Sequence, residues 1–246
     1  MDPSEIKKFE SRKWVKKPDF NIDKLSARSD RVVETILLDM SIQYLDLSDK
    51  RILNVGGGHG PEAEFLLKKG AKSVTLLDIS QGQLENTLVR IQERHLEDLA
   101  CIRGDAENLP FQDNSFDLGY IFMALHHFPN NIQAISEICR ASKDVIFVDI
   151  MDSLLTRILT KFGFFEREWC GIEPNRLDQK NVENTLQRNN LSPTITYFFV
   201  APVYTYNLAL IRFLVSFFKL SSHLTSRNKT LGIICGNVAI INGKRI

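Results

Sequence analysis

Residues 51–60 read RILNVGGGHG, and twenty positions after Gly58 the sequence LLD occupies residues 76–78. A short apolar run that stops at glycines is typical of a buried strand followed by a tight turn. The second run ends in an acidic residue, Asp78. Because the carboxyl ends of parallel strands border one crevice, we expect the glycines and Asp78 to lie side by side at a ligand site.

Short apolar runs and amphipathic stretches alternate along the rest of the chain. This alternation predicts an α/β fold with right-handed crossovers and a mostly parallel sheet that is covered by helices on both faces. Strands are predicted at residues 51–55, 73–77, 99–103, 116–122, 144–150, 194–200 and 232–241. Helices are predicted near residues 29–45, 61–69, 81–95, 131–142 and 178–189.

The composition excludes several classes of protein. The chain has 246 residues with a formal net charge of +1 and no long block of Lys and Arg, so we expect no nucleic-acid partner. Its four cysteines are far apart and show no metal-ligand spacing, which indicates reduced thiols and no metal site. The first residues lack the apolar stretch of a secretory signal, and we therefore predict a cytoplasmic location.

The apolar segment 195–220 raises the question of a membrane span. Pro202, Asn207 and Arg212 interrupt it, and no clean run approaches the ~20 apolar residues that a spanning helix needs. We therefore predict a strand, a turn and an apolar helix in this segment.

The spacing of the glycines separates two classes of nucleotide site. Glycines at 56, 58 and 60 follow the pattern GxGxG, whereas the dinucleotide fingerprint GxGxxG is matched only weakly. Glycines allow positive φ angles and close approach of a ligand to backbone N–H groups. A carboxylate at Asp78 can accept the hydroxyl groups of a ribose, so the expected ligand resembles a nucleoside.

Four motifs occur in order over about residues 50–150: VGGGHG, LLDIS, GDAENLPFQDNSFD and ALHHF. Together they resemble the class I S-adenosylmethionine-dependent methyltransferases, and most closely the small-molecule subgroup that includes the ubiquinone and menaquinone methyltransferases. The resemblance implies a Rossmann-like fold with a seven-stranded sheet whose last strand is antiparallel. It also implies S-adenosyl-L-methionine as cofactor and S-adenosyl-L-homocysteine as product.

The resemblance also assigns roles to single residues. It implies that Asp78 binds the ribose, that Ile79 lies on the adenine and that the glycines surround the amino-acid part of the cofactor. The implied cofactor-binding residues are Asn54, Gly56, Gly58, Gly60, Asp78, Ile79, Asp105, Ala106, Met123 and His126. Asn54 stands where many relatives carry an acidic residue, which weakens the expected contact with the cofactor's ammonium group. Gly57 replaces a frequent Cys or Ser, and we expect this change to be harmless.

Three residues are candidates for catalysis. His126 and His127 follow the fourth strand, and Asp149 ends the fifth, so all three are expected at the ligand edge of the sheet. A histidine there can act as a general base when the acceptor must lose a proton. The alternative is a structural turn in which both imidazoles bond to the backbone, and Asp78 and Asp105 could likewise serve only as helix caps.

The remaining segments are expected to surround the acceptor. We predict an N-terminal flap or flexible segment at 1–28 and a single domain at 29–246, with lid insertions at about 151–175 and 202–230. Both insertions are apolar, which indicates a cover over a pocket for a lipophilic acceptor. The sequence leaves two alternatives open, namely a small core of the lid itself and a membrane-surface or homodimer contact through 202–220.

The predicted function is transfer of a methyl group to O, C or N of a small, hydrophobic molecule. Two alternatives belong to other classes: a non-catalytic scaffold or sensor that keeps the cofactor pocket, and a nicotinamide-nucleotide-dependent oxidoreductase. The glycine spacing and the lack of a recognisable Tyr-x-x-x-Lys motif disfavour the oxidoreductase. The sequence does not identify the acceptor or the oligomeric state.

Overall fold

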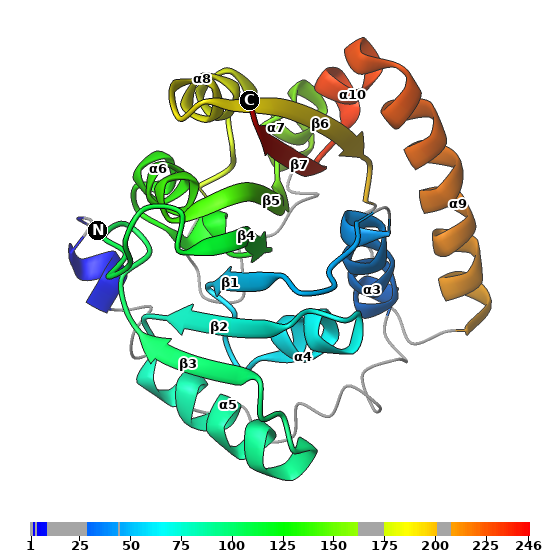
Figure 1. Ribbon diagram of the computed structural model, residues 1–246. Helices are drawn as coiled ribbons and strands as arrows, with labels where there is room; N and C mark the ends of the chain where they lie inside the picture. Colours follow the sequence, from blue (N-terminus) through cyan, green and yellow to red (C-terminus); the bar gives the residue numbers. More distant parts are fainter. Residues whose placement is uncertain (1, 3, 9–28, 44, 162–174, 201–207) are drawn as a thin grey trace.

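Seven strands form one sheet in the computed structural model of the chain (Figure 1), in the order β3-β2-β1-β4-β5-β7-β6. The structure describes residues 2, 4–8, 29–43, 45–161, 175–200 and 208–246. The strands are β1 (Arg51–Val55), β2 (Ser73–Asp78), β3 (Leu99–Arg103), β4 (Phe116–Phe122), β5 (Ser142–Ile150), β6 (Leu191–Phe198) and β7 (Val238–Arg245). The helices are α3 (Ser29–Ile42), α4 (Pro61–Lys68), α5 (Gln81–Arg94), η1 (Leu125–His127), α6 (Asn131–Ala141), α7 (Leu154–Lys161), α8 (Gln179–Arg188), α9 (Leu208–Arg227) and α10 (Lys229–Cys235).

The pairing of the strands fixes the position of the crevice. Strands β1 to β5 are mutually parallel, and β7 runs antiparallel between β5 and β6. The predicted mostly parallel sheet with an antiparallel last strand is confirmed. Because β1 lies between β2 and β4, the strand order reverses at β1. Ligands bind at such a reversal, beside the carboxyl ends of the strands.

Helices cover both faces of the sheet, as the alternation in the sequence predicts. Ile52 of β1 faces a core layer that it shares with α3, α4, α5 and α9, whereas Leu53 and Val55 face a layer that they share with α6 and α8. Side chains of a strand point alternately to its two faces, so an apolar run such as RILNV suits a strand that is buried on both sides. Figure 1 shows these two groups of helices on either side of the sheet.

The prediction of a last strand at 232–241 is wrong in its boundaries. Residues up to Cys235 form helix α10, and β7 begins only at Val238. The side chain of Asn228 caps this helix by accepting a hydrogen bond from the backbone N–H of Leu231, over 3.0 Å. A Cβ at Gly232 would lie 2.9 Å from atoms of Tyr197, so this glycine lets α10 approach β6 closely.

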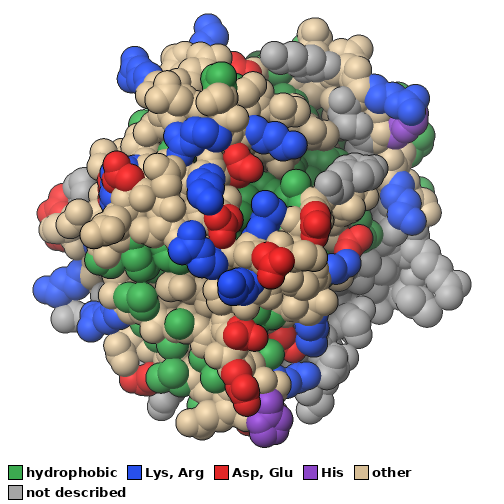
Figure 2. Space-filling model, viewed as in Figure 1, with side chains coloured by type: hydrophobic (Ala, Val, Ile, Leu, Met, Phe, Trp, Pro, Cys, Tyr) green, Lys and Arg blue, Asp and Glu red, His purple; other side chains and the backbone are tan. Residues whose placement is uncertain are grey.

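The two predicted lids are described only in part. The first contains α7 and the second contains α9, while 162–174 and 201–207 lie outside the described residues. Of the predicted flap at 1–28, only residues 2 and 4–8 are described. No helix in the described part of the chain combines the length and the apolar character that crossing a membrane requires. The face seen in Figure 2 carries acidic and basic side chains that are interspersed, in line with the small net charge.

Candidate functional site

The turn between β1 and α4 holds three glycines in the left-handed conformation. The φ angles are 68° at Gly56, 54° at Gly58 and 88° at Gly60. Residues with a Cβ rarely adopt this conformation, so the turn favours glycine. Gly56 also lacks room for a side chain, because an added Cβ would lie 2.7 Å from the Cβ of Ala124. The turn after β1 therefore touches the segment that follows β4.

Asp78 joins this turn to the start of α5. Its Oδ2 accepts a hydrogen bond from the backbone N–H of Gly58 over 2.9 Å, and its Oδ1 accepts one from Ser80 over 2.8 Å. The N-cap residue of α5 is Ser80, so Asp78 is not the N-cap itself. The half-buried carboxylate thus lies at the carboxyl end of β2 and against the glycine turn. This is the position expected for a residue that binds a ribose.

Asn54 lies beneath the turn and is almost completely buried. Its Nδ2 donates to the carbonyl of Tyr120 over 3.4 Å, while its Oδ1 has no hydrogen-bond partner among the described residues. A Cβ at Gly57 would lie 2.2 Å from this Oδ1 and 2.8 Å from Leu76. Asn54 and Leu76 together therefore leave no room for a side chain at Gly57.

Two side chains of α5 hold the carbonyl groups of the turn. The hydroxyl of Thr87 donates to the carbonyl of Gly58 over 2.8 Å, and Nε of Arg90 donates to the carbonyl of His59 over 3.0 Å. Both side chains are largely buried. The turn is thus fixed on the α5 side by its carbonyl groups and on the β2 side by its contact with Asp78.

Arg90 is itself held by a buried ion pair. Its Nη1 lies 2.6 Å from Oε2 of Glu64 on α4, and the two side chains are 9% and 3% exposed. Burial alone would raise the pKa of Glu64, but hydrogen bonds from Lys68 and Arg90 lower it below its usual value. Glu64 therefore remains a carboxylate, and the pair links α4 and α5 behind the glycine turn.

The loop after β3 brings Asp105 and Ala106 to the same side of the sheet. Oδ1 of Asp105 accepts the backbone N–H of Glu107 over 2.9 Å, and Oδ2 pairs with Lys7 over 2.8 Å. Lys7 also pairs with Glu107 over 2.6 Å. Burial lowers the pKa of Lys7, but these carboxylates raise it above its usual value. The Asp105 carboxylate thus anchors the N-terminal segment, while Ala106 is buried below it.

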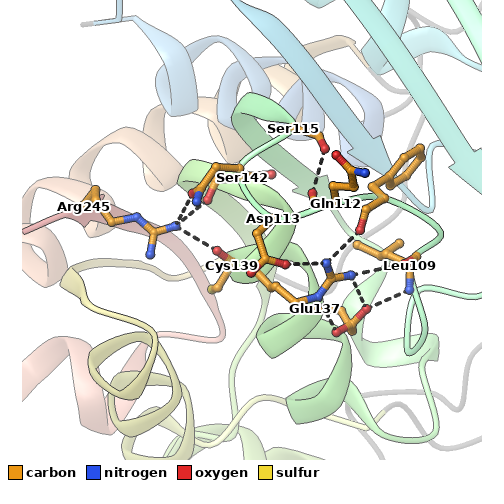
Figure 3. A network of polar contacts seen from close by, with 11 residues as sticks. Leu109, Gln112, Asp113, Ser115, Glu137, Cys139, Ser142 and Arg245 are labelled. Carbon is orange, nitrogen blue, oxygen red and sulfur yellow. Dashed lines mark hydrogen bonds and ion pairs between the residues drawn. The ribbon is translucent and has the colours of Figure 1, made fainter.

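A polar network tethers the same loop to α6 (Figure 3). Arg140 donates to the carbonyl groups of Leu109 and Phe111 and pairs with Asp113 and Glu137. Glu137 in turn accepts the backbone N–H of Leu109 over 2.9 Å. The hydrogen bonds that Arg140 donates to Glu137 and Asp113 raise the pKa of its guanidinium. The loop that carries Asp105 is therefore held at both of its ends.

The segment after β4 begins with a strained residue. Met123 has a φ of 50°, a conformation that few residues other than glycine adopt. Its backbone N–H donates to the carbonyl of Val148 over 2.7 Å, which keeps the segment against β5. Such strain persists where the surrounding structure fixes the backbone, and it is frequent at active sites.

His126 and Asp149 form a buried pair next to this strained residue. Nδ1 of His126 lies 2.5 Å from Oδ1 of Asp149, and the side chains are 5% and 0% exposed. The other oxygen of Asp149 accepts the backbone N–H of Leu125 over 2.7 Å. The carbonyl of His126 accepts the N–H of Asn175 over 2.9 Å. The carboxylate therefore fixes the imidazole and favours the tautomer with its proton on Nδ1.

The structure brings the predicted residues into two neighbouring groups. Gly56, Gly58 and Asp78 lie around the turn after β1, and His126 with Asp149 lies behind the segment after β4. The contact between Gly56 and Ala124 joins the groups. Ile79 is half-buried after β2, and the ring of His127 lies 4.2 Å from that of His126, at a tilt of 40°.

Several residues of the site carry no signal in the sequence. Thr87 and Arg90 sit on an ordinary amphipathic helix, and Lys7 belongs to a charged segment with no motif. Asn175 follows an apolar insertion from which no position could be deduced. Their roles follow from tertiary contacts: α5 packs on the glycine turn, Lys7 pairs with the loop after β3, and Asn175 bonds to the carbonyl of His126.

The observed donors and acceptors fit an adenosine-containing cofactor with an amino-acid part. Asn54 offers a buried oxygen beneath the turn that has no hydrogen-bond partner among the described residues. The turn itself requires glycine at Gly56 both for its positive φ and for the close approach of Ala124. A ligand could therefore approach the backbone of the turn and the Oδ1 of Asn54. The resemblance implies that the amino-acid part of the cofactor binds at this position.

The comparison with protein families gives one match, a model described as a methyltransferase domain, over residues 53–145. Curated relatives include phthiotriol/phenolphthiotriol dimycocerosates methyltransferase 1 of Mycobacterium ulcerans, which is 30% identical over 59% of this chain and 52% of that protein. Methyltransferase GfsG of Streptomyces halstedii is 28% identical over 58% of this chain and 53% of its own. The chain thus spans about half the length of the curated relatives that it matches.

Solved structures share the fold at low identity. Magnesium protoporphyrin IX methyltransferase from Synechocystis, solved with bound S-adenosyl-L-homocysteine, has a TM-score of 0.66 at 14% identity, covering 99% of this chain and all of that chain. Geranyl diphosphate C-methyltransferase from Streptomyces coelicolor, also with bound S-adenosyl-L-homocysteine, has a TM-score of 0.62 at 15% identity, covering 95% of this chain and 86% of that chain. The predicted cofactor, S-adenosyl-L-methionine, is supported by these findings, while the predicted quinone-like subgroup stays a prediction.

Proposed function

We propose that this chain, which belongs to the class I S-adenosylmethionine-dependent methyltransferases, transfers a methyl group to a hydroxyl oxygen of a small, lipophilic molecule. The choice of oxygen among O, C and N rests on one observation, the buried pair of His126 and Asp149. A hydroxyl must lose its proton when it is methylated, and a histidine held by a carboxylate is suited to accept it. The lipid named in the mycobacterial relatives supports a lipophilic acceptor.

The cofactor-binding part of the proposal follows the geometry of the turn. When bound, S-adenosyl-L-methionine supplies a methyl group that is already activated on a sulfonium. The turn at Gly56, Gly58 and Gly60 would hold its amino-acid part, Asp78 its ribose and Ile79 its adenine. Ala106 and the backbone of Asp105 would meet the adenine edge, because the Asp105 carboxylate is engaged by Lys7.

The catalytic part of the proposal assigns different roles to three residues. Asp149 accepts a hydrogen bond from Nδ1–H of His126, so that Nε2 is the ring nitrogen that takes the proton of the acceptor hydroxyl. Asp149 is thus a positioning residue, and Leu125 fixes it through the backbone. His127, whose ring lies tilted beside that of His126, shapes the site without taking the proton. The protein otherwise orients the acceptor and excludes water.

Calorimetry with S-adenosyl-L-methionine tests the cofactor site without knowledge of the acceptor. The wild-type chain should bind, and Asp78→Ala should weaken binding by about 1–3 kcal/mol, because buried groups lose a hydrogen-bond partner. Asp98→Ala is the matched control, because Asp98 is an exposed residue just before β3, at the edge of the sheet opposite to the site. A wild-type chain that ignores the cofactor, or an Asp78→Ala chain that binds like the control, would contradict this part.

The acceptor atom is tested by the release of S-adenosyl-L-homocysteine, measured by mass spectrometry. Long-chain alcohols and phenols are offered in parallel with amines of the same chain length. We expect release, and a product heavier by one methylene, only with the hydroxyl compounds. Methylation of the amines alone would exclude an oxygen acceptor, and binding without turnover of any compound would favour a scaffold or sensor.

A further inference from the structure

Helix α9 exposes an apolar stripe on the outside of the molecule. Phe213, Phe217, Leu220 and Leu224 are 63%, 38%, 62% and 51% exposed. They recur at intervals of four, three and four residues, so at 100° per residue they share an arc of about 60°. The face that packs on the protein is a different one, since Phe218 and Thr225 are buried. The stripe therefore lies mostly outside the core, although Phe217 also packs edge-on against Phe199.

Basic residues follow one flank of this stripe. Lys219, His223 and Arg227 are exposed, and helical geometry places them in a row next to the apolar side chains. At the upper right edge of Figure 2, beside the upper part of α9, basic and histidine side chains lie next to apolar ones, and α9 itself contains no Asp or Glu. An apolar stripe with a basic flank is the pattern of helices that lie on a membrane surface.

The charge of the chain is divided unevenly along its length. No Asp or Glu occurs from Asn184 to Ile246. The formal charge of residues 184–246 is therefore +7, and that of residues 1–183 is −6, which together give the net charge of +1. The seven basic residues are Arg188, Arg212, Lys219, Arg227, Lys229, Lys244 and Arg245. The part of the chain that presents the stripe is thus uniformly positive.

We propose that the outer face of α9 docks on the surface of an anionic lipid bilayer. Phe213, Phe217, Leu220 and Leu224 enter the boundary between headgroups and acyl chains, and Lys219 and Arg227 contact the anionic headgroups. A second copy of the chain fits this face less well, because joining two stripes would bring two rows of positive charge together without a carboxylate to neutralise them. The inference is independent of the proposed methyl transfer.

Flotation with lipid vesicles tests the proposal on the full chain. Wild-type protein should float with phosphatidylcholine–phosphatidylglycerol vesicles, far less with pure phosphatidylcholine, and less at high salt. The charge variant Lys219→Glu/Arg227→Glu and the apolar variant Phe213→Ser/Leu220→Ser should each lose at least about tenfold in partition coefficient. All four side chains are exposed, so both variants should unfold at the wild-type temperature.

Matched controls change the same kinds of residue elsewhere. Lys72→Glu/Lys180→Glu reverses two exposed charges, and Leu88→Ser/Val89→Ser removes two exposed apolar side chains of α5. Both control variants should float like the wild type. Wild-type protein that stays with the aqueous fraction, or α9 variants that float like the controls, would overturn the proposal. So would a wild-type dimer in sedimentation that Phe213→Ser/Leu220→Ser dissociates, because the stripe would then join two copies.

Discussion

Asn54 and Gly57 show how one side chain restricts another within the glycine turn. Gly57→Ser restores a residue that is frequent in the family, yet it should destabilise this chain by about 1–3 kcal/mol because its Cβ meets Asn54 and Leu76. Urea unfolding measures the loss. In Gly57→Ser/Asn54→Ala, which removes the nearest atom, part of the stability should return. A Gly57→Ser chain as stable as the wild type would show that the turn adjusts freely.

Asp149 should affect turnover and leave cofactor binding unchanged. Asp149→Asn keeps the shape but can present an N–H to His126, which favours the wrong tautomer. We expect kcat to fall by about 10²-fold or more, with the affinity for S-adenosyl-L-methionine from calorimetry within error of the wild type. Asp152→Asn, which breaks a surface pair with Arg157, is the control. Equal kcat values in both variants would restrict His126 to a structural role.

At the scale of residues, the sequence identifies the positions that follow strands. Gly56, Gly58, Asp78 and Asp149 could be placed because the carboxyl ends of parallel strands face one crevice. The contact between His126 and Asp149 could be suspected but not deduced, because the residues come from different strands. The sequence could not show that a side chain at Gly57 would meet Asn54, since the separation of 2.2 Å depends on the rotamer of Asn54 beneath the turn.

Helices α4 and α5 are joined by the ion pair of Glu64 and Arg90 behind the glycine turn. Variants of this pair separate its effect on stability from its effect on cofactor binding. Arg90→Met leaves Glu64 buried with one partner fewer, so we expect a loss of about 3 kcal/mol in the free energy of unfolding. Cofactor binding should weaken by about 1–2 kcal/mol, because the carbonyl of His59 loses its donor.

The double variant Glu64→Met/Arg90→Met serves as the control for this prediction. It removes both charges, so stability should largely return, whereas the affinity for S-adenosyl-L-methionine should stay low because no donor replaces Arg90. Urea unfolding and calorimetry on the three chains check the split. If affinity and stability recovered together, Arg90 would act only through the general stability of α4 and α5.

At the scale of elements, most helices and strands could be predicted from periodicity, and α10 shows where this fails. The run GIICGNVAII satisfies the pattern of a buried strand, but Asn228 starts a helix and Gly232 and Gly236 let that helix lie against Tyr197. Both glycines look like strand interruptions in the sequence, whereas their function is close approach. The partner that they approach is not visible from local sequence.

The acid stability of the whole molecule should depend on Asp117, which joins the amino ends of β1, β4 and β5. Its carboxylate accepts the backbone N–H of Arg51 on β1 and pairs with Lys143 on β5. The hydrogen bond from Lys143, against an opposing effect of burial, lowers the pKa of Asp117 well below its usual range. A lowered pKa in the folded chain stabilises it above the pKa of the unfolded chain, near 4, and this stabilisation is lost as the pH falls further.

Urea unfolding at pH 6 and at low pH checks this prediction. From pH 6 to low pH, the free energy of unfolding should fall by about 1–2 kcal/mol less in Asp117→Asn than in the wild type, because the variant has no carboxylate to protonate at this position. Asp98→Asn removes an exposed carboxylate for which no such contact occurs among the described residues, and it should follow the wild type. An unchanged pH dependence in Asp117→Asn would mean that other carboxylates control acid unfolding.

At the scale of the molecule, the sequence predicted the class of fold and the edge of the sheet that holds the site. It could do so because strand and helix periods, glycine turns and the order of motifs are local signals. The anchoring of the N-terminal segment by Lys7, the two-part hold on the loop after β3 and the exposed stripe of α9 are tertiary properties. These properties depend on which faces of the helices, strands and loops pack against one another, and this packing cannot be deduced from a single sequence.

The position of β7 also sets the order in which a ribosome can complete this fold. β7 pairs with β5 on one side and β6 on the other, although β5 ends at Ile150 and β7 begins at Val238. While the chain is being synthesised, β5 therefore presents an open edge, and β6 emerges before the only strand that it pairs with in the described residues. Such edges invite aggregation. Until Arg245 has emerged, the unpaired edges of β5 and β6 therefore remain open to pairing with other chains.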